Sequence, residues 1–371
     1  EITKGLKNVG VNVVDSGINY NPTLLPNFTE LNNNIDLNNS LEVCYGSTEG
    51  PFFDYTSCLP EYHAHGTKVA CLIGAEANNI EGSCGVAWDI NLLSIKISSA
   101  LSGINFSEVA KVFNSNDNNY RGYVPITNMS FGIPISYGEN NNIYYTNHCD
   151  ALLTALSSYS GLLVVAAGND GSNIDQAINK FYPASFDISN MIVVGSSNQN
   201  DEKYYLSNYG ANTVDLFAPG SQIIAPMFEV NNGNLVQMTN GYFSGTSAAA
   251  PLVSGTAALI KAVNPNLTAL EIKSLILNNV DTNANLSVSG GRLNTYKAVK
   301  AAIPEIATFN SFINGIQPLP SNKQQFYKIS LTPGTYTFET SGNLNTSGYL
   351  YRDIQSSPVV SSINQSGNFS L

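Results

Sequence analysis

The sequence predicts an α/β fold, in which helices cover both faces of a parallel β-sheet, followed by a small β module. Two observations predict it. Apolar runs of strand length recur along most of the chain, and they are continuously hydrophobic, which is typical of strands buried on both faces of a parallel sheet. Helical patterns separate these runs, and such alternation of strand and helix favours parallel strands covered by helices.

Each predicted element has its place in the chain. The predicted strands are 8–17, 90–98, 124–132, 161–169 and 190–197. The predicted helices are 65–77, about 105–115, 148–160, 246–263, 268–279 and 292–302.

The pattern changes near Pro304. The stretch "FYKISLTPGTYTFETSGN" (326–343) predicts two strands around a Pro-Gly turn, and short strands and polar turns follow it. The chain ends in "NFSL" without an obvious closing strand. We therefore expect a large α/β domain, residues 1–303, and a small β-rich module, residues 304–371, that the chain leaves incomplete.

Composition excludes some classes of function. The chain has 371 residues, of which 43% are hydrophobic, so a large core can form. Charged residues make up 12% and the net charge is −11, whereas a nucleic-acid partner would require basic stripes. No run of 18 apolar residues occurs, so we expect no membrane span.

The cysteines leave two interpretations open. A disulfide between Cys44 and Cys58 would close a 15-residue loop and would add roughly 3 kcal/mol of stability. Cys71 and Cys84 are candidates for a second pair, which leaves Cys149 over. One or two disulfides would indicate an oxidising compartment, and the alternative is five free thiols.

Four polar residues lie where strands end or helices begin. Asp15 ends the first strand in "VVDSG", and His65 begins a helix in "HGTKVACLIGA". Asn169 ends another strand in "VVAAGNDG", and Ser247 begins a helix in "SGTSAAAP". Because the carboxyl ends of parallel strands and the amino ends of the following helices share one edge of a sheet, we expect these four residues to converge.

Their chemistry is complementary. A serine hydroxyl becomes nucleophilic when an imidazole takes its proton, and a carboxylate fixes the tautomer of that imidazole. An asparagine amide can donate to the oxyanion that forms. Small residues beside Ser247 leave room for a substrate, and Pro251 lacks the N–H that would bond to the Ser247 carbonyl in a regular helix.

The motifs "DSG", "HGT", "AAGN" and "GTSAAAP", in this order, resemble those of the subtilisin-like serine proteases (subtilases), and the resemblance covers about residues 8–303. It implies a subtilisin-like fold and a secreted serine endopeptidase that needs no cofactor for its chemistry. Asp15 would orient His65, His65 would be the general acid and base, and Ser247 the nucleophile. The Asn169 side chain and the Ser247 N–H would bind the oxyanion.

The resemblance also implies how a protein or peptide substrate binds. An extended peptide would pair with Ser130, Phe131 and Gly132. The subsite for the residue before the scissile bond would be walled by three residues that end the strand 161–169, namely Ala166, Ala167 and Gly168. The preferred residue there stays open: Phe181 would narrow this subsite, and Asp170 would favour basic residues at its rim.

Processing is a further implication of the resemblance. The sequence opens on a short lead before the first strand, "EITKGLKNVGVNVVDSG", which is typical of a processed start. We therefore expect an N-terminal pro-segment as an intramolecular inhibitor.

Some positions depart from the family pattern. Ala248 replaces the usual methionine after the serine, and Lys68 replaces a second histidine. The stretch "ANNIEGSCGVA" (77–87) resembles the loop that binds structural calcium in many subtilases, and the oxygen ligands would come from the Asn79 side chain and from the carbonyls of Ala77, Glu81 and Ser83. The alternative is an ordinary turn in an Asn-rich chain.

Residues from about 305 resemble the prepeptidase C-terminal β modules of secreted peptidases, whose role here stays open between targeting, substrate docking and removal during maturation.

Two other functions are alternatives for this sequence. A catalytically silent subtilase-fold protein for binding or adhesion would agree with the scarcity of charge, but every residue of the triad is retained. An α/β-hydrolase esterase would have a Gly-x-Ser-x-Gly motif and the order Ser, Asp or Glu, His, and the sequence has neither.

Overall fold

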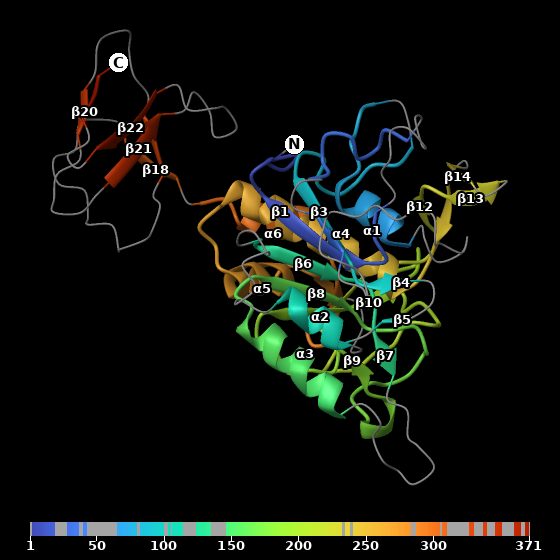
Figure 1. Ribbon diagram of the computed structural model, residues 1–371. Coiled ribbons are helices and arrows are strands. Elements are labelled where there is room, and N and C mark those ends of the chain that lie inside the picture. Colours follow the sequence, from blue (N-terminus) through green and yellow to red (C-terminus); the bar gives the residue numbers. More distant parts are fainter. Residues whose placement is uncertain are drawn as a thin grey trace. The chain divides into compact units, whose positions relative to one another are not determined.

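A computed structural model gives the structure of the chain (Figure 1). It describes residues 2–18, 28–36, 40–42, 65–79, 82–99, 103–104, 106–113, 124–134, 146–231, 234–237, 240–282 and 287–304, and beyond them the strands 306–309, 326–329, 337–339, 346–350, 360–364 and 368–370. The chain divides into two compact units, Glu1–Ile303 and Pro304–Leu371.

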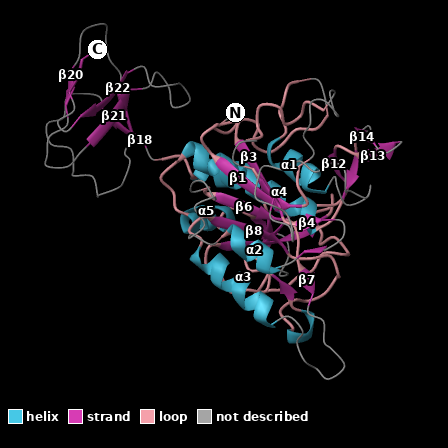
Figure 2. Cartoon of the chain, viewed as in Figure 1, coloured by secondary structure: helices cyan, strands magenta, loops and turns pink. Residues whose placement is uncertain are grey.

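The first unit is built on a nine-stranded sheet with the order β16-β17-β11-β10-β8-β6-β1-β3-β2 (Figures 1 and 2). Neighbouring strands are parallel, except that β16 is antiparallel to β17. The strands are β1 (Gly10–Asp15), β2 (Leu41–Glu42), β3 (Asn91–Lys96), β6 (Ile126–Met129), β8 (Leu162–Ala166), β10 (Met191–Ser197), β11 (Leu216–Pro219), β16 (Asp281–Thr282) and β17 (Gly291–Arg292).

Helices pack on both faces of this sheet, so the predicted α/β class is confirmed. They are α1 (His65–Gly74), α2 (Phe106–Val112), α3 (Thr146–Ser158), α4 (Thr246–Val263), α5 (Ala269–Leu277) and α6 (Thr295–Ala301). One core cluster joins the sheet to α1, α4, α5 and α6, and a second joins it to α2 and α3.

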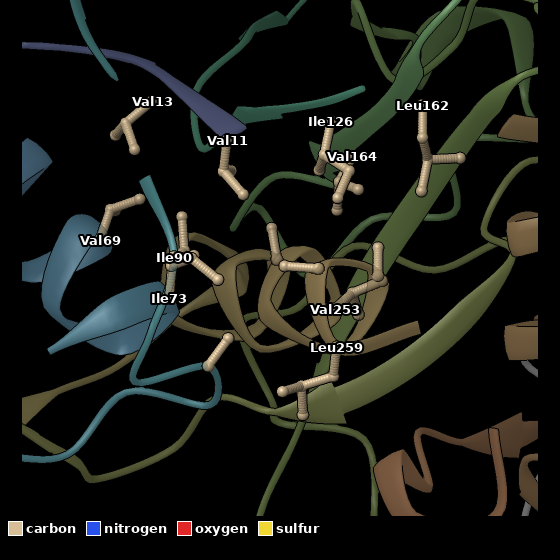
Figure 3. Packing of buried hydrophobic residues seen from close by; sticks show 14 of the residues in the cluster. Val11, Val13, Val69, Ile73, Ile90, Ile126, Leu162, Val164, Val253 and Leu259 are labelled. Carbon is tan, nitrogen blue, oxygen red and sulfur yellow. The ribbon is translucent and has the colours of Figure 1, made fainter. Parts of the chain in front are cut away.

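Strand β8 shows why its sequence is continuously apolar. Leu162 and Val164 belong to the first cluster, whereas Leu163 and Val165 belong to the second. Successive side chains of a strand point to opposite faces, so both faces must be hydrophobic when both are covered. Figure 3 shows the first cluster, in which Leu162 and Val164 lie near Val253 and Leu259 of α4.

The described part of the first unit also contains short antiparallel strand pairs that are separate from the nine-stranded sheet. They are β4 (Ser98–Ser99) with β5 (Gly103–Ile104), β7 (Ile133–Pro134) with β9 (Phe181–Tyr182), β12 (Ile223–Ala225) with β15 (Gly241–Phe243), and β13 (Phe228–Asn231) with β14 (Asn234–Gln237). A 3₁₀ helix, Ala177–Asn179, precedes β9.

Helix α4 runs through the middle of the first unit. Among the described helices, it alone is long and apolar enough to cross a membrane, but 72% of it is buried inside the protein. Its apolar surface packs against α1 and the sheet, as in the central helix of a globular domain.

The second unit contains three strand pairs. They are β18 (Ile306–Phe309) with β19 (Phe326–Ile329), β20 (Thr337–Glu339) with β23 (Asn368–Ser370), and β21 (Thr346–Leu350) with β22 (Val360–Asn364). Strands β19 and β20 lie on either side of the Pro-Gly segment in the sequence, where two strands were predicted; β19 pairs with β18 and β20 with β23. Asn368–Ser370 also form a strand, which the sequence did not show because its partner lies far away along the chain.

The described cysteines are free, so the candidate pair Cys71 and Cys84 forms no disulfide in the structure, as in the alternative of free thiols. Cys71 is buried in α1 among core side chains, whereas Cys84 is exposed and its thiol donates to the Gly85 carbonyl. The two thiols therefore lie in different surroundings, that of Cys71 in the core and that of Cys84 at the surface. Cys44 and Cys58 lie outside the described residues.

Candidate active site

Asp15 and His65 meet at the carboxyl edge of the sheet. Strand β1 ends at Asp15 and helix α1 begins at His65, and the His65 Nδ1 lies 2.8 Å from the Asp15 Oδ1. The Ser16 N–H donates to the same oxygen at 2.7 Å. An ionised carboxylate can only accept, so this geometry favours the tautomer with its proton on Nδ1 and leaves Nε2 as the basic nitrogen.

The pKa of His65 depends on competing influences. Burial disfavours the imidazolium and by itself would lower the pKa. The negative charge of Asp15 and its hydrogen bond raise the pKa, and the positive charge of Lys68 lowers it. The net effect is a pKa above the ordinary histidine value. The Asp15 side chain is 4% exposed and the His65 side chain 32%, so the imidazole remains accessible from solvent.

An aromatic ring supports the imidazole. Phe243, the last residue of β15, meets the His65 ring edge to face, with 5.5 Å between the ring centroids. The Lys68 Nζ lies 5.3 Å from the centroid of the same Phe243 ring. Lys68, which stands where the family often has a second histidine, thus places a cation over the aromatic ring that contacts His65.

Ser247 lies in the first turn of α4 and is joined to the segment after β6. Its hydroxyl donates to the Ser130 carbonyl at 2.9 Å, and the Ser130 hydroxyl donates to the Ser247 carbonyl at 3.1 Å. Pro251 has no N–H to bond that carbonyl within the helix, so the carbonyl is available to Ser130. Within the described part of the chain, the Ser247 hydroxyl bonds to Ser130 and not to His65.

Asn169 is held by the residue before the serine. Its Oδ1 accepts from the Thr246 N–H at 2.9 Å and from the Thr246 hydroxyl at 3.2 Å. A backbone N–H can only donate, so the atom that faces it must be the amide oxygen. The Nδ2 group consequently faces away from Thr246, where it is free to donate to a ligand.

The predicted substrate-binding residues lie on adjacent strands. Ser130, Phe131 and Gly132 follow β6, and Ala166, Ala167 and Gly168 end and follow β8. The two strands are paired, with Met129 opposite Val165. The structure therefore places both triplets side by side, next to Ser247.

Two buried polar residues of the site were not predicted. Asn128 in β6 donates to the Ser130 hydroxyl at 2.9 Å and accepts from the Ser254 hydroxyl of α4 at 2.8 Å. Asn208 donates to the Ala167 carbonyl at 2.9 Å and accepts from the N–H of Asp170 at 3.0 Å. One signal was available for the first of them: an asparagine inside an apolar strand must find hydrogen-bond partners there.

The predicted calcium loop lies beside a carboxylate that sequence reasoning missed. Glu30 is 1% exposed, and its Oε2 accepts from the Ser83 hydroxyl at 2.7 Å. A Cβ on Gly82 would overlap the Glu30 carboxylate, so the loop packs closely onto it. Among the described residues, no group of three His, Cys, Asp or Glu side chains is placed to hold a metal. Ala77 and Asn79 are described, whereas Glu81 lies outside the described residues.

Cys71 is the second neighbour of that carboxylate. Burial raises the pKa of the Cys71 thiol well above its usual value, and the charge and hydrogen bond of Glu30 raise it further. The thiol therefore stays protonated.

Comparisons with known proteins agree with the motifs. A model of the subtilase family matches residues 6–297. The chain is 28% identical over 312 residues to a thermophilic serine proteinase of Bacillus sp. (strain AK1), covering 81% of this chain and 63% of that protein. It is 34% identical over 241 residues to alkaline elastase YaB of Bacillus sp. (strain YaB), covering 63% of this chain and 54% of that protein. The chain thus spans between half and two thirds of the length of these relatives.

A solved structure shows the same fold. It is the structure of a protease from Pseudoalteromonas arctica PAMC 21717. The two chains are 25% identical in sequence and superpose with a TM-score of 0.63, and the match covers 80% of this chain and 90% of that one. The family resemblance and the subtilisin-like α/β fold predicted from the sequence are both confirmed.

Proposed function

The chain belongs to the subtilase family, and from this premise we propose that it is a serine endopeptidase whose triad is Asp15, His65 and Ser247. The observation that supports this most directly is the Asp15–His65 hydrogen bond of 2.8 Å at the edge where Ser247 begins α4. A buried carboxylate that fixes an accessible imidazole is the arrangement that a general base requires.

The first step is activation of the serine. The Ser247 hydroxyl turns from the Ser130 carbonyl toward Nε2 of His65, which takes its proton as the oxygen attacks the peptide carbonyl. Asp15 stabilises the imidazolium that results, consistent with the raised pKa of His65. His65 then gives the proton to the leaving amine, and a water repeats the sequence to release the acid.

The second requirement is a site for the negative charge on the carbonyl oxygen. The Asn169 Nδ2 supplies one donor, since its Oδ1 is held by Thr246. The Ser247 N–H supplies another, because N–H groups in the first turn of a helix have no partner within that helix. The positive end of the α4 dipole favours an anion at the same place.

Substrate binding and location complete the proposal. A protein or peptide substrate binds in extended form along Ser130, Phe131 and Gly132, and opposite them along Ala166, Ala167 and Gly168. The relatives of Dichelobacter nodosus and Xanthomonas campestris are named extracellular proteases, which supports a secreted protein. An N-terminal pro-segment as intramolecular inhibitor is part of the same proposal.

Replacing the nucleophile tests the function. In the Ser247→Ala variant we expect casein hydrolysis and labelling by a fluorophosphonate both to disappear, because the hydroxyl proposed as the nucleophile is removed. The measurements are release of soluble peptides and fluorescence of the labelled protein on a gel.

Ser244→Ala is the matched control. Ser244 is an exposed serine three residues earlier whose hydroxyl accepts from the Gln222 N–H, so this variant should retain cleavage and labelling. Unchanged cleavage in Ser247→Ala would contradict the triad, and a folded native chain that never takes the label would favour a silent binding protein.

Structural calcium belongs to the proposal as well. The Glu30 carboxylate, the Asn79 side chain and the carbonyls of Ala77, Glu81 and Ser83 are oxygen donors of the kind that calcium prefers. Glu30 supports the site, because a buried carboxylate beside the loop gains most from a bound cation. The ion would stabilise the loop and take no part in the reaction.

Metal removal tests the calcium site. Calcium at 100 times its dissociation constant would add about 2.7 kcal/mol to the free energy of unfolding, so we expect EDTA to lower the melting temperature. Glu30→Gln should abolish the response to calcium, and Glu202→Gln, a surface change elsewhere, should keep it. Equal melting temperatures of the native protein with EDTA and with excess calcium would exclude this site.

A further inference from the structure

The ring of Phe181 fills the space between the two strand ends beside the nucleophile. A Cβ built on Gly132 would overlap Cε1 of Phe181, and a Cβ built on Gly168 would lie 3.0 Å from Cδ2 and Cε2 of the same ring. Cε1 belongs to one edge of the ring, and Cδ2 and Cε2 belong to the other. One aromatic ring thus spans from the segment after β6 to the segment after β8.

Backbone pairing holds the ring there. Phe181 lies opposite Pro134 in the β7–β9 pair, and its N–H donates to the Ser185 hydroxyl at 3.0 Å. Its side chain is 8% exposed. The strand pair therefore fixes the backbone of Phe181, and the ring that it carries is buried.

The position of the Phe181 ring matters because the two glycines that it approaches lie close to residues of the proposed active site. Ser130 bonds to the nucleophile, and Gly132 is two residues further on. Asn169 bonds to Thr246, and Gly168 immediately precedes it. In the proposed reaction the carbonyl under attack lies between Ser247 and Asn169, so the side chain on the acyl side of that carbonyl begins between the two glycine segments. This step rests on the proposed function.

We propose that Phe181 sets the specificity of the enzyme by occupying the subsite for the residue before the scissile bond, so that substrates with Gly, Ala or Ser at this position are cleaved. A large side chain there would have to displace the ring, whereas a methyl or hydroxymethyl group fits above it. Asp170 does not overcome this restriction for basic residues, since its Oδ2 already accepts from the Asn208 amide at 3.1 Å.

A series of substrates on the native full-length protein tests the proposal. The probes are tetrapeptide p-nitroanilides that differ in the residue before the scissile bond: Ala, Ser, Phe, Leu or Lys. We expect kcat/KM for the Ala peptide to exceed that for the Phe peptide by about 100-fold or more, because a hydrophobic site that is too small rejects added bulk strongly. Equal or faster cleavage of the Phe peptide would overturn the proposal.

Variants separate specificity from packing. Phe181→Gly should raise kcat/KM for the Phe peptide at least tenfold relative to the Ala peptide, and Phe181→Leu, which keeps more of the core, should change the ratio in the same direction. Phe186→Ala is the control, because Phe186 packs on Tyr182 in the same core cluster without approaching either glycine, and it should leave the ratio unchanged. An unchanged ratio in folded Phe181→Leu would mean that Phe181 is a core residue without a role in specificity.

Fluorophosphonate labelling distinguishes a failure of the proposed role of Phe181 from a failure of the proposed function. The label needs the activated Ser247 but no side chain in the subsite. A labelled enzyme that prefers the Phe peptide contradicts the role of Phe181 alone. An unlabelled folded protein contradicts the proposed function, and the inference on Phe181 fails with it.

Discussion

The charge on Lys68 opposes the charge that His65 takes up in the proposed reaction. Asp15 raises the pKa of His65, and Lys68 lowers it in part. Catalysis needs the neutral imidazole, so activity is lost as the pH falls through the raised pKa of His65. The position of this acid limb therefore reports the balance between Asp15 and Lys68.

Removing the Lys68 charge should move the acid limb to higher pH. In Lys68→Met no positive charge at residue 68 counteracts the effect of Asp15 on the pKa of His65. We therefore expect the apparent pKa that the acid limb reports to rise by up to about one unit. The measurement is kcat/KM against pH with the Ala peptide. Methionine keeps an apolar stem against Phe243, so the packing of that ring is largely preserved.

Lys300→Met is the matched control for Lys68→Met. Lys300 also lies over an aromatic ring, that of Tyr296 at 5.7 Å, but it belongs to α6 and not to the site. Its removal should leave the pH profile in place. A downward shift of the limb in Lys68→Met would contradict the assigned influence of Lys68.

At the scale of elements, a buried polar chain fixes the start of α4 to strand β6. Ser254 of α4 donates to Asn128, Asn128 donates to Ser130, and Ser130 donates to the carbonyl of Ser247. Asn128, Ser130 and Ser254 are all buried, and low dielectric makes unsatisfied polar groups costly there. These hydrogen bonds thus set the position of the helix turn that bears Ser247, the proposed nucleophile.

Breaking this chain should reduce turnover as well as stability. Asn128→Ala leaves the Ser254 hydroxyl without its acceptor and the Ser130 hydroxyl without its donor, so we expect a loss of about 1–3 kcal/mol in the free energy of unfolding. We also expect kcat to fall by about tenfold, since small displacements of a nucleophile slow attack. Urea unfolding and steady-state kinetics measure the two effects.

Asn12→Ala separates these effects. Asn12 in β1 is buried and donates to the Thr127 hydroxyl at 3.2 Å, but this bond does not continue to Ser247. The variant should lose stability without losing kcat. Equal loss of kcat in both variants would mean that the Asn128 chain acts through stability alone.

The elements predicted from the sequence share a physical cause. Helix α4 was predicted with its observed bounds, 246–263, because small and apolar residues run through five turns without a break other than Pro251. Strands β1, β8 and β10 were found because two covered faces make a strand continuously apolar. Strand β11 was missed because four residues, "LFAP", give no period, and its pairing with β10 decides its state.

The residues of the site likewise divide into those that the sequence predicts and those that it does not. Motifs placed Asp15, His65 and Asn169 at one edge, since topology alone brings strand ends together. Glu30 and Asn208 were missed because their roles depend on contacts between segments that are distant along the chain. Cys71 and Cys84 were candidates for a disulfide, with free thiols as the alternative, and the sequence does not show that α1 turns Cys71 into the core.

At the scale of the whole molecule, an ion-pair cluster closes one edge of the central sheet. Arg292 of β17 lies 3.1 Å from Asp281 of β16 and 2.7 Å from Asp201, in the turn after β10. Lys297 of α6 lies 2.6 Å from Asp281, and Asn294 donates to the same carboxylate at 3.0 and 3.1 Å. Strand β17 and helix α6 are thus both linked to the edge strand β16 through the Asp281 carboxylate.

This cluster makes stability depend on pH through Asp281. The hydrogen bond of Lys297, then that of Asn294, hold the pKa of Asp281 below its ordinary value. A carboxyl whose pKa is lower in the folded state stabilises above its unfolded pKa, and this contribution is lost as the pH falls through the folded pKa. The side chains are partly exposed, so the contribution is about 1 kcal/mol or less.

The Asp281→Asn variant should therefore melt about 1–3 °C below the native protein at pH 7, and the difference should shrink below about pH 4 as the native carboxyl is protonated. Asp89→Asn is the control, because Asp89 pairs with Lys7 at 3.7 Å with both side chains nearly half exposed, and such a pair contributes little at any pH. Melting curves between pH 3 and 8 measure both variants. A difference for Asp281→Asn that grew toward low pH would show the opposite sign of linkage, and the cluster would then not stabilise the sheet edge through the charge of Asp281.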